Sequence, residues 1–76
     1  MATLMWEVRA AAGRLDELVS YVDAHADPAA TIFRSAEPDP RVVLIDPTGC
    51  GLADVPAELI ARPPHSWPFE SVERRQ

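Results

Sequence analysis

His65 and Trp67 are the residues whose types and spacing most suggest chemistry. Side chains two positions apart on a strand project from the same face, so the imidazole would stand beside the indole. Such a pair suits a flat aromatic ligand or a haem. The structural alternative, which we favour, is that Trp67 and Phe69 fill the core and His65 caps a loop, since large aromatic residues are ordinary core material.

A second group of interest consists of Glu7 and Arg9, together with Arg34. A guanidinium group grips a carboxylate or a phosphate through two parallel hydrogen bonds, so either arginine could hold an anionic ligand. The alternative, which we favour, is a cross-strand ion pair at an interface or an edge, on the second face of the sheet. The candidate ligand-binding residues are therefore Trp6, Glu7, Arg9, Arg34, His65 and Trp67.

The single cysteine, Cys50, lies between two glycines in a loop. A reactive thiol needs a nearby cation or a helix start that favours the thiolate, and the sequence places neither beside it. Cys50 and His65 together supply too few ligands for a closed metal site. The chain also has no glycine-rich phosphate loop, HExxH motif or Ser-His-Asp order. We expect no metal and no cofactor, and no catalytic residue is assigned.

Charge excludes two classes of partner. Twelve carboxylates outweigh seven arginines in a chain of 76 residues, for a net charge of −5. An acidic domain repels nucleic acid and anionic membranes. No apolar stretch approaches the ~18 residues of a membrane span, the first residues lack the pattern of a secretion signal, and the one cysteine has no disulfide partner. We therefore expect a cytoplasmic protein.

Hydrophobic periodicity predicts the elements that position these residues. Residues 3–9 alternate between apolar and other side chains, which predicts a half-buried strand. Residues 14–26 carry an apolar stripe at helical spacing and end before Pro28, which predicts a helix. Further strands are predicted at 30–35, 41–46 and 65–72, the last at an edge because it contains Pro68. A short helix is predicted at 55–61, with Asp54 as its cap.

This order predicts an α+β domain of the ferredoxin-like βαββαβ type over residues 1–76, with a disordered tail at 73–76. Its four-stranded antiparallel sheet would carry both helices on one face. The segment Val42–Ile45 is apolar on both sides, so it should be central and covered on both faces. No part of the chain remains to cover the second face. We therefore expect a homodimer in which two sheets face each other.

The first 46 residues resemble the antibiotic biosynthesis monooxygenase-like domains of the dimeric α+β barrel superfamily. The resemblance lies in Met5–Arg9 leading to Gly13–Leu18, and in Thr31–Ser35 paired with Val42–Ile45. It implies a two-fold dimer with facing sheets, and either cofactor-independent oxidation of aromatic compounds or haem handling. The chain is shorter than the usual family domain and contains no asparagine, a residue often used by the catalytic members.

The leading hypothesis is a small homodimeric accessory or ligand-binding protein without catalytic activity of its own. One alternative is a cofactor-independent monooxygenase-like or haem-handling enzyme, with Trp6, His65 and Trp67 near its pocket. Another is a protein-interaction module. The corresponding partners would be a second copy of the chain, a small aromatic ligand or a larger enzyme.

Overall fold

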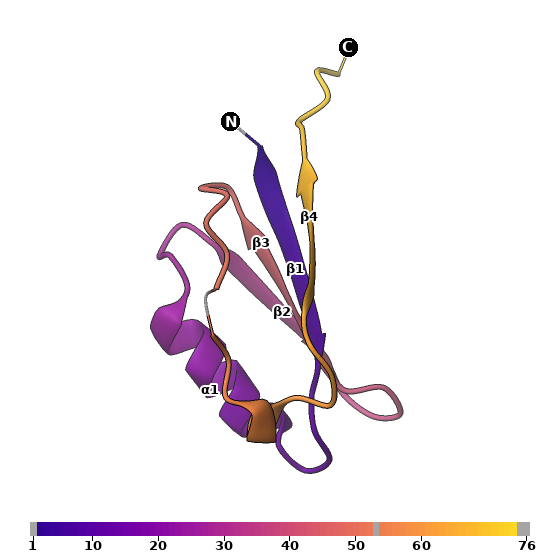
Figure 1. The fold of residues 1–76 in the computed structure, drawn as a ribbon. Coiled ribbons are helices and arrows are strands. Elements are labelled where there is room, and N and C mark those ends of the chain that lie inside the picture. The colour runs from indigo at the N-terminus through magenta and orange to yellow at the C-terminus, as the bar shows by residue number, and fades with distance from the viewer. Residues whose placement is uncertain (1, 53, 75–76) are drawn as a thin grey trace.

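A four-stranded antiparallel sheet and one α-helix make up this α+β fold in a computed structural model, which describes residues 2–52 and 54–74 (Figure 1). The elements are β1 (Thr3–Arg9), α1 (Leu15–His25), β2 (Thr31–Ser35), β3 (Arg41–Asp46), the 3-10 turn η1 (Ala57–Leu59) and β4 (His65–Phe69). The strand order β2-β3-β1-β4, antiparallel throughout, is compatible with a ferredoxin-like fold.

The two central strands, β1 and β3, have the bounds that the alternation predicts. Their register places Trp6 opposite Leu44 and Val8 opposite Val42, and all four side chains are buried on the face that α1 covers. On the second face of β3, Val43 and Ile45 are half-buried, and among the described residues neither belongs to the core cluster or packs against it.

The helix α1 forms within the predicted range. Its buried residues Leu18 and Val22 lie one turn apart and pack on the sheet. Carboxylates occupy its first turn and His25 its last turn, as the helix dipole favours. The ring of His25 also stacks on that of Tyr21, with centroids 4.0 Å apart.

The predicted second helix at 55–61 is wrong. Only η1 forms, and it has no side-chain cap. Hydrogen bonds to the end of β1 and the residues after it replace those that a helix would make. The Ala11 N–H donates to the Leu59 carbonyl at 3.0 Å, and the Ala61 N–H donates to the Arg9 carbonyl at 2.9 Å. An isolated helix this short is costly to nucleate, so pairing with the extension of β1 prevails. Leu59 is the buried anchor of this segment.

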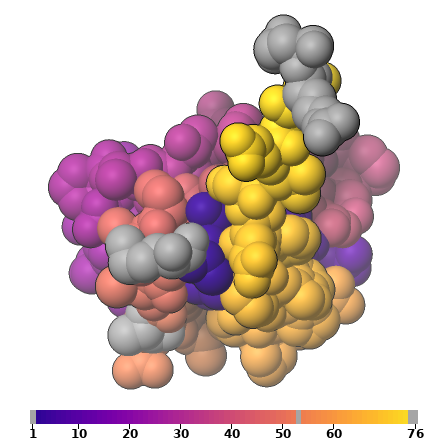
Figure 2. All heavy atoms as spheres, turned by 90° about the horizontal axis from the view of Figure 1, so that it is seen from above, coloured from indigo at the N-terminus to yellow at the C-terminus, as the bar shows by residue number. Residues whose placement is uncertain are grey.

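The edge strands β2 and β4 are more exposed than the central pair. β4 ends at Phe69 rather than at 72, and its place beside β1 at the sheet edge agrees with the prediction from Pro68. Seen from above, the yellow C-terminal part of the chain lies against the indigo N-terminal part (Figure 2). All five residues of β4 are exposed. The predicted tail at 73–76 falls partly outside the described residues.

In the part of the chain that the structure describes, no helix combines the length and hydropathy needed to cross a membrane.

Candidate functional site

Of the candidates Trp6, His65 and Trp67, the first lies on one face of the sheet and the other two lie on the opposite face. Trp6 is buried on the face that α1 covers, where it belongs to the core. His65 and Trp67 project from the other face of neighbouring β4, since Met5 pairs with Trp67 and Glu7 pairs with His65. The structure therefore does not bring Trp6 together with the other two, as a shared pocket would require.

His65 and Trp67 form an edge-to-face pair. Their ring centroids are 5.9 Å apart and the ring planes are inclined by 84°. Both side chains are exposed, and Phe69 is exposed beside them. The interpretation that Trp67 and Phe69 fill the core is therefore wrong, because the core lies on the opposite face. An exposed imidazole next to an indole edge can receive a ligand, but the described contacts give His65 no hydrogen-bonded acid or base.

Glu7 and Arg9 belong to a four-residue ion-pair network with Arg41 and Asp39. Arg41 donates to Glu7 at 2.5 Å and also contacts Asp39, and Arg9 binds Asp39 at 2.9 Å. Glu7 is the most protected member, with its side chain 13% exposed. The charges alternate and cancel, so each arginine already has a carboxylate partner. The network is suited to holding β1, β3 and the β2–β3 loop together.

Arg34 does not join this network. It lies on the face of β2 that also carries Ile32, a residue packed against the core, and pairs with Asp16 of α1 at 3.3 Å. Both side chains are largely exposed, so the pair is a weak surface contact. The expectation that Arg34 shares the second face of the sheet with Glu7 and Arg9 is wrong, because alternation along β2 directs it toward the helix.

Asp46 is a polar residue that the sequence reasoning missed. Its carboxylate is fully buried at the end of β3 and accepts hydrogen bonds from the Thr48 hydroxyl at 2.6 Å and from the Thr48 and Gly51 N–H groups at 2.8 Å. Burial by itself would raise the pKa of Asp46, but these hydrogen bonds outweigh it and lower the pKa below its ordinary value. The sequence contains a signal for this arrangement, an Asp two residues before a Thr in a glycine-containing turn.

This loop also carries Cys50. Its backbone N–H donates to the Thr48 hydroxyl at 3.3 Å, and its thiol is exposed. Gly51 has a φ of +65°, and a Cβ added there would meet Leu4 at 2.5 Å, so the turn is shaped for glycine. Within residues 2–52 and 54–74, no group of three metal-ligating side chains comes together.

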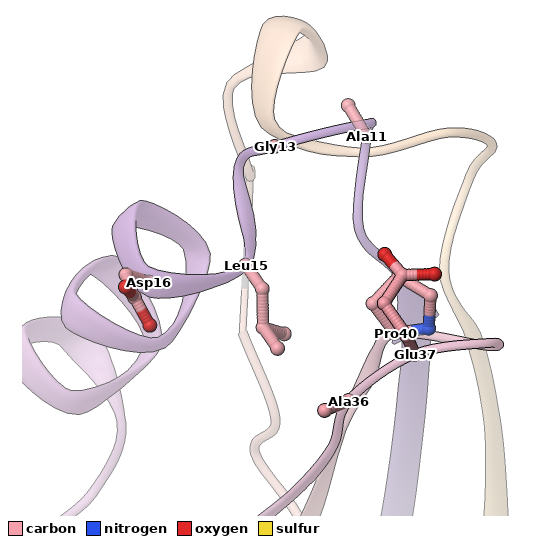
Figure 3. Close-up of a pocket in the computed structure, with 7 residues that line it drawn as sticks. All are labelled: Ala11, Gly13, Leu15, Asp16, Ala36, Glu37 and Pro40. Atoms are coloured by element: carbon pink, nitrogen blue, oxygen red, sulfur yellow. The ribbon is translucent and has the colours of Figure 1, made fainter.

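Two shallow hollows lie away from all but one of the candidate residues. One, of about 250 Å³, lies between the β1–α1 loop and the β2–β3 loop, where Leu15 and Glu37 are among its lining residues (Figure 3). The other, of about 300 Å³, runs between α1 and β2 and includes Arg34. Both are open to solvent, and neither contains His65 or Trp67.

A further exposed apolar feature is the sheet face opposite α1, which we call the open sheet face. Three of its aromatic side chains are strongly exposed: Phe33 by 56%, Phe69 by 50% and Trp67 by 44%. Strand alternation and register place half-buried aliphatic residues between them. Its apolar residues are Met5, Phe33, Val43, Ile45, Trp67 and Phe69.

Comparison of the chain with protein-family models, with curated proteins and with solved structures found no match.

Proposed function

We propose that this chain is a small accessory or ligand-binding protein that works as a homodimer and has no catalytic activity of its own. The observation that carries this proposal is the open sheet face, where three aromatic side chains are about half exposed. Monomeric soluble proteins rarely leave large contiguous apolar patches in water, and such patches usually mark binding surfaces.

The environments of the candidate residues support binding over catalysis. Trp6 is part of the core, and Glu7 and Arg9 are neutralised by the ion-pair network. His65 has an aromatic neighbour but no acid or base aligned with it among the described contacts. General acid–base chemistry needs a titrating group held against a partner, and these side chains are arranged to pack and to pair.

The strand order supports a place for the chain among the ferredoxin-like dimeric α+β barrels. The resemblance to antibiotic biosynthesis monooxygenase-like domains adds to this proposal and implies facing sheets. The lack of asparagine argues against the catalytic role of that family. A shared fold does not transfer an activity without the residues that carry it.

One rival function has an observation in its favour. The exposed imidazole of His65 beside Trp67 is suited to a haem or another flat aromatic ligand. A shifted Soret band on addition of haemin to the purified chain, lost in His65→Ala, would replace the proposed function with haem handling. A larger protein bound at the open sheet face would make the chain an interaction module instead.

Light scattering tests the proposal on the purified full-length chain over a wide range of concentrations. We expect the mass of two chains at high concentration and a fall toward the mass of one chain on dilution, because apolar contact is opposed by the entropy of association. A mass of one chain at every concentration would contradict the homodimer.

A further inference from the structure

The hollow between α1 and β2 is a candidate binding site within a single copy of the chain. Its volume of about 300 Å³ lies at the lower end of the range found for pockets that hold small molecules. Two aliphatic and three polar side chains line it: Val19, Ser20, Asp23, Ile32 and Arg34. Because α1 and β2 come from one chain and α1 contacts β2, the hollow forms with or without a second copy (Figure 1).

Charged groups follow one another along this hollow. Asp16, Val19 and Asp23 share one face of α1, because residues three, four and seven positions apart lie above one another on a helix. The Cα atoms of Asp16 and Asp23 are therefore about 10 Å apart along the helix axis. Arg34 lies at the Asp16 end, with its Nη1 3.3 Å from the Asp16 Oδ1. A guanidinium and a carboxylate thus lie at one end, and a second carboxylate lies toward the other.

The surface between these two ends is aliphatic. Val19 and Ile32 are half-buried and pack against the core. Ile32 and Arg34 project from the same face of β2, since they are two positions apart on a strand. An aliphatic chain lying between α1 and β2 would leave water for contact with apolar side chains, which favours binding. The hollow therefore suits a ligand with an aliphatic stem between charged ends.

The charged side chains at both ends can accept a ligand. The contact of Arg34 with Asp16 is a single hydrogen bond to a carboxylate that is 94% exposed, so this pair is weak. A guanidinium carries five N–H donors and holds a carboxylate through two of them. None of the ion pairs in the described part of the chain includes Asp23. Arg34 can therefore bind a carboxylate, and Asp23 can bind an ammonium group.

The charges of the site favour a ligand with a net positive charge. Arg34 is outweighed by Asp16 and Asp23, and the whole chain has a net charge of −5, which attracts cations. The two aspartates would repel a simple carboxylate, and a simple diamine would leave the guanidinium without an anion. A molecule with one carboxylate and two ammonium groups matches all three side chains.

We propose that the hollow between α1 and β2 binds a free basic amino acid of the lysine type. Its carboxylate binds Arg34, its α-ammonium lies beside Asp16, and its side-chain ammonium reaches Asp23. The flexible four-carbon stem of lysine lies on Val19 and Ile32. This inference rests on the proposed function, in which the chain binds a ligand without transforming it, and it adds the site and the class of ligand.

Titration of the full-length, nitrogen-15-labelled chain with L-lysine tests the site by nuclear magnetic resonance. We expect a Kd on the order of 1 mM, because the hollow is open and a small ligand retains little net binding energy there. The amide signals of residues 19–23 and 31–34 should shift. The indole N–H signal of Trp67, on the opposite face of the sheet, should stay in place.

Two variants test the two ends of the ligand separately. Asp23→Asn should raise the Kd of lysine about fivefold and leave that of norleucine, which lacks the side-chain ammonium, unchanged. Arg34→Gln should raise the Kd of lysine about tenfold and leave cadaverine, which lacks the carboxylate, no more weakly bound. Selective losses of this kind report contacts with the ligand, since a disturbed fold would weaken every ligand alike.

Arg14→Gln and Glu17→Gln are the matched controls. Arg14 and Glu17 form an ion pair at 2.8 Å on the same helix, and neither lines the hollow. Each substitution removes the same charge as one of the test variants, and we expect it to change the Kd of lysine by less than about twofold, because exposed charges outside the site are screened by salt. Circular dichroism melting curves check that all four variants remain folded.

The possible results separate the inference from the proposed function. Shifts at the hollow, with ligand-selective losses in Asp23→Asn and Arg34→Gln and unchanged controls, support the inference. No shift with lysine, shifts confined to the open sheet face, or equal binding of norleucine and lysine overturns it, and leaves the homodimer to be judged by light scattering. A mass of one chain at every concentration, with the shifts at the hollow intact, supports the site and overturns the homodimer of the proposed function.

Discussion

The two faces of the sheet are built from the same strands but have opposite environments. On the face that α1 covers, Val42 and Leu44 have no solvent exposure. On the other face, Val43 and Ile45 are half-buried and Phe33 is more exposed than buried. Consecutive residues of β3 thus alternate between the buried core and the partly exposed open sheet face.

The difference between the two faces shows that hydrophobic side chains of one strand do not all contribute to the stability of the folded chain in the same way. The residues facing α1 stabilise the folded chain by leaving water during folding. The residues on the open sheet face gain less from folding, because the described part of the chain places no helix above them. In the proposed dimer, a second copy would supply the layer that covers them.

The largest expected effect comes from matched substitutions at neighbouring positions of β3. Val42→Ala removes fully buried methyl groups, so we expect it to lower the free energy of unfolding by about 2 kcal/mol. Val43→Ala, at a half-buried position, should cost less than about 1 kcal/mol in the dilute monomer. Urea denaturation at low protein concentration measures both, and equal effects would break the comparison of the two faces.

The next effect concerns Asp46, at the end of the buried face. Asp46→Asn replaces an acceptor oxygen that meets several N–H and O–H donors, and we expect a loss of about 1–2 kcal/mol at neutral pH. The pKa of Asp46 is lower in the folded chain than its ordinary value of 3.8. Its contribution to stability is therefore complete above that value and is lost as the pH falls through the folded-state pKa.

The pH dependence of the Asp46 effect is measured by urea denaturation of the wild-type chain and Asp46→Asn between neutral and acid pH. We expect the stability difference between them to shrink in acid. Asp23→Asn, at an exposed position of α1, is the control and should change stability little at any pH in that range. A difference that stays constant into strong acid would contradict the assigned role of the Asp46 carboxylate.

The smallest expected effect compares one ion pair on each face. Arg41→Gln leaves the protected Glu7 without its partner, and we expect a loss of about 1–2 kcal/mol together with a weaker dimer. Arg34→Gln breaks the exposed pair with Asp16 and should have no measurable effect on either quantity. Thermal melting measures the stability of both variants, and sedimentation measures their dimerisation. A larger effect of Arg34→Gln than of Arg41→Gln would show that the open sheet face tolerates an unpaired charge.

Most of the fold could be predicted because periodicity reports which side of an element is buried. β1 and β3 have the predicted bounds, and α1 lies within its predicted range. The helix at 55–61 could not be excluded, since its apolar residues fit a short helix as well as a turn. The hydrogen bonds of Ala11 and Ala61 with this segment are long-range contacts that no local pattern contains.

The candidate site was less predictable than the fold. The alternation that placed Glu7 and Arg9 on one face does not reveal their partners, Arg41 and Asp39, which come from another strand and its preceding loop. Trp67 and Phe69 are residue types that are common in cores. They are exposed because β4 lies at the sheet edge and their side chains project from the face opposite the core.

The sequence by itself determined β1, β3, the position of α1 and the central place of Val42–Ile45, because these follow from residue type and spacing along one chain. Tertiary structure decided which polar groups meet, that Asp46 is buried, and that Trp6 lies on the far side of the sheet from His65 and Trp67. Those outcomes depend on strand register and on how far each loop reaches, which are properties of contacts between distant residues.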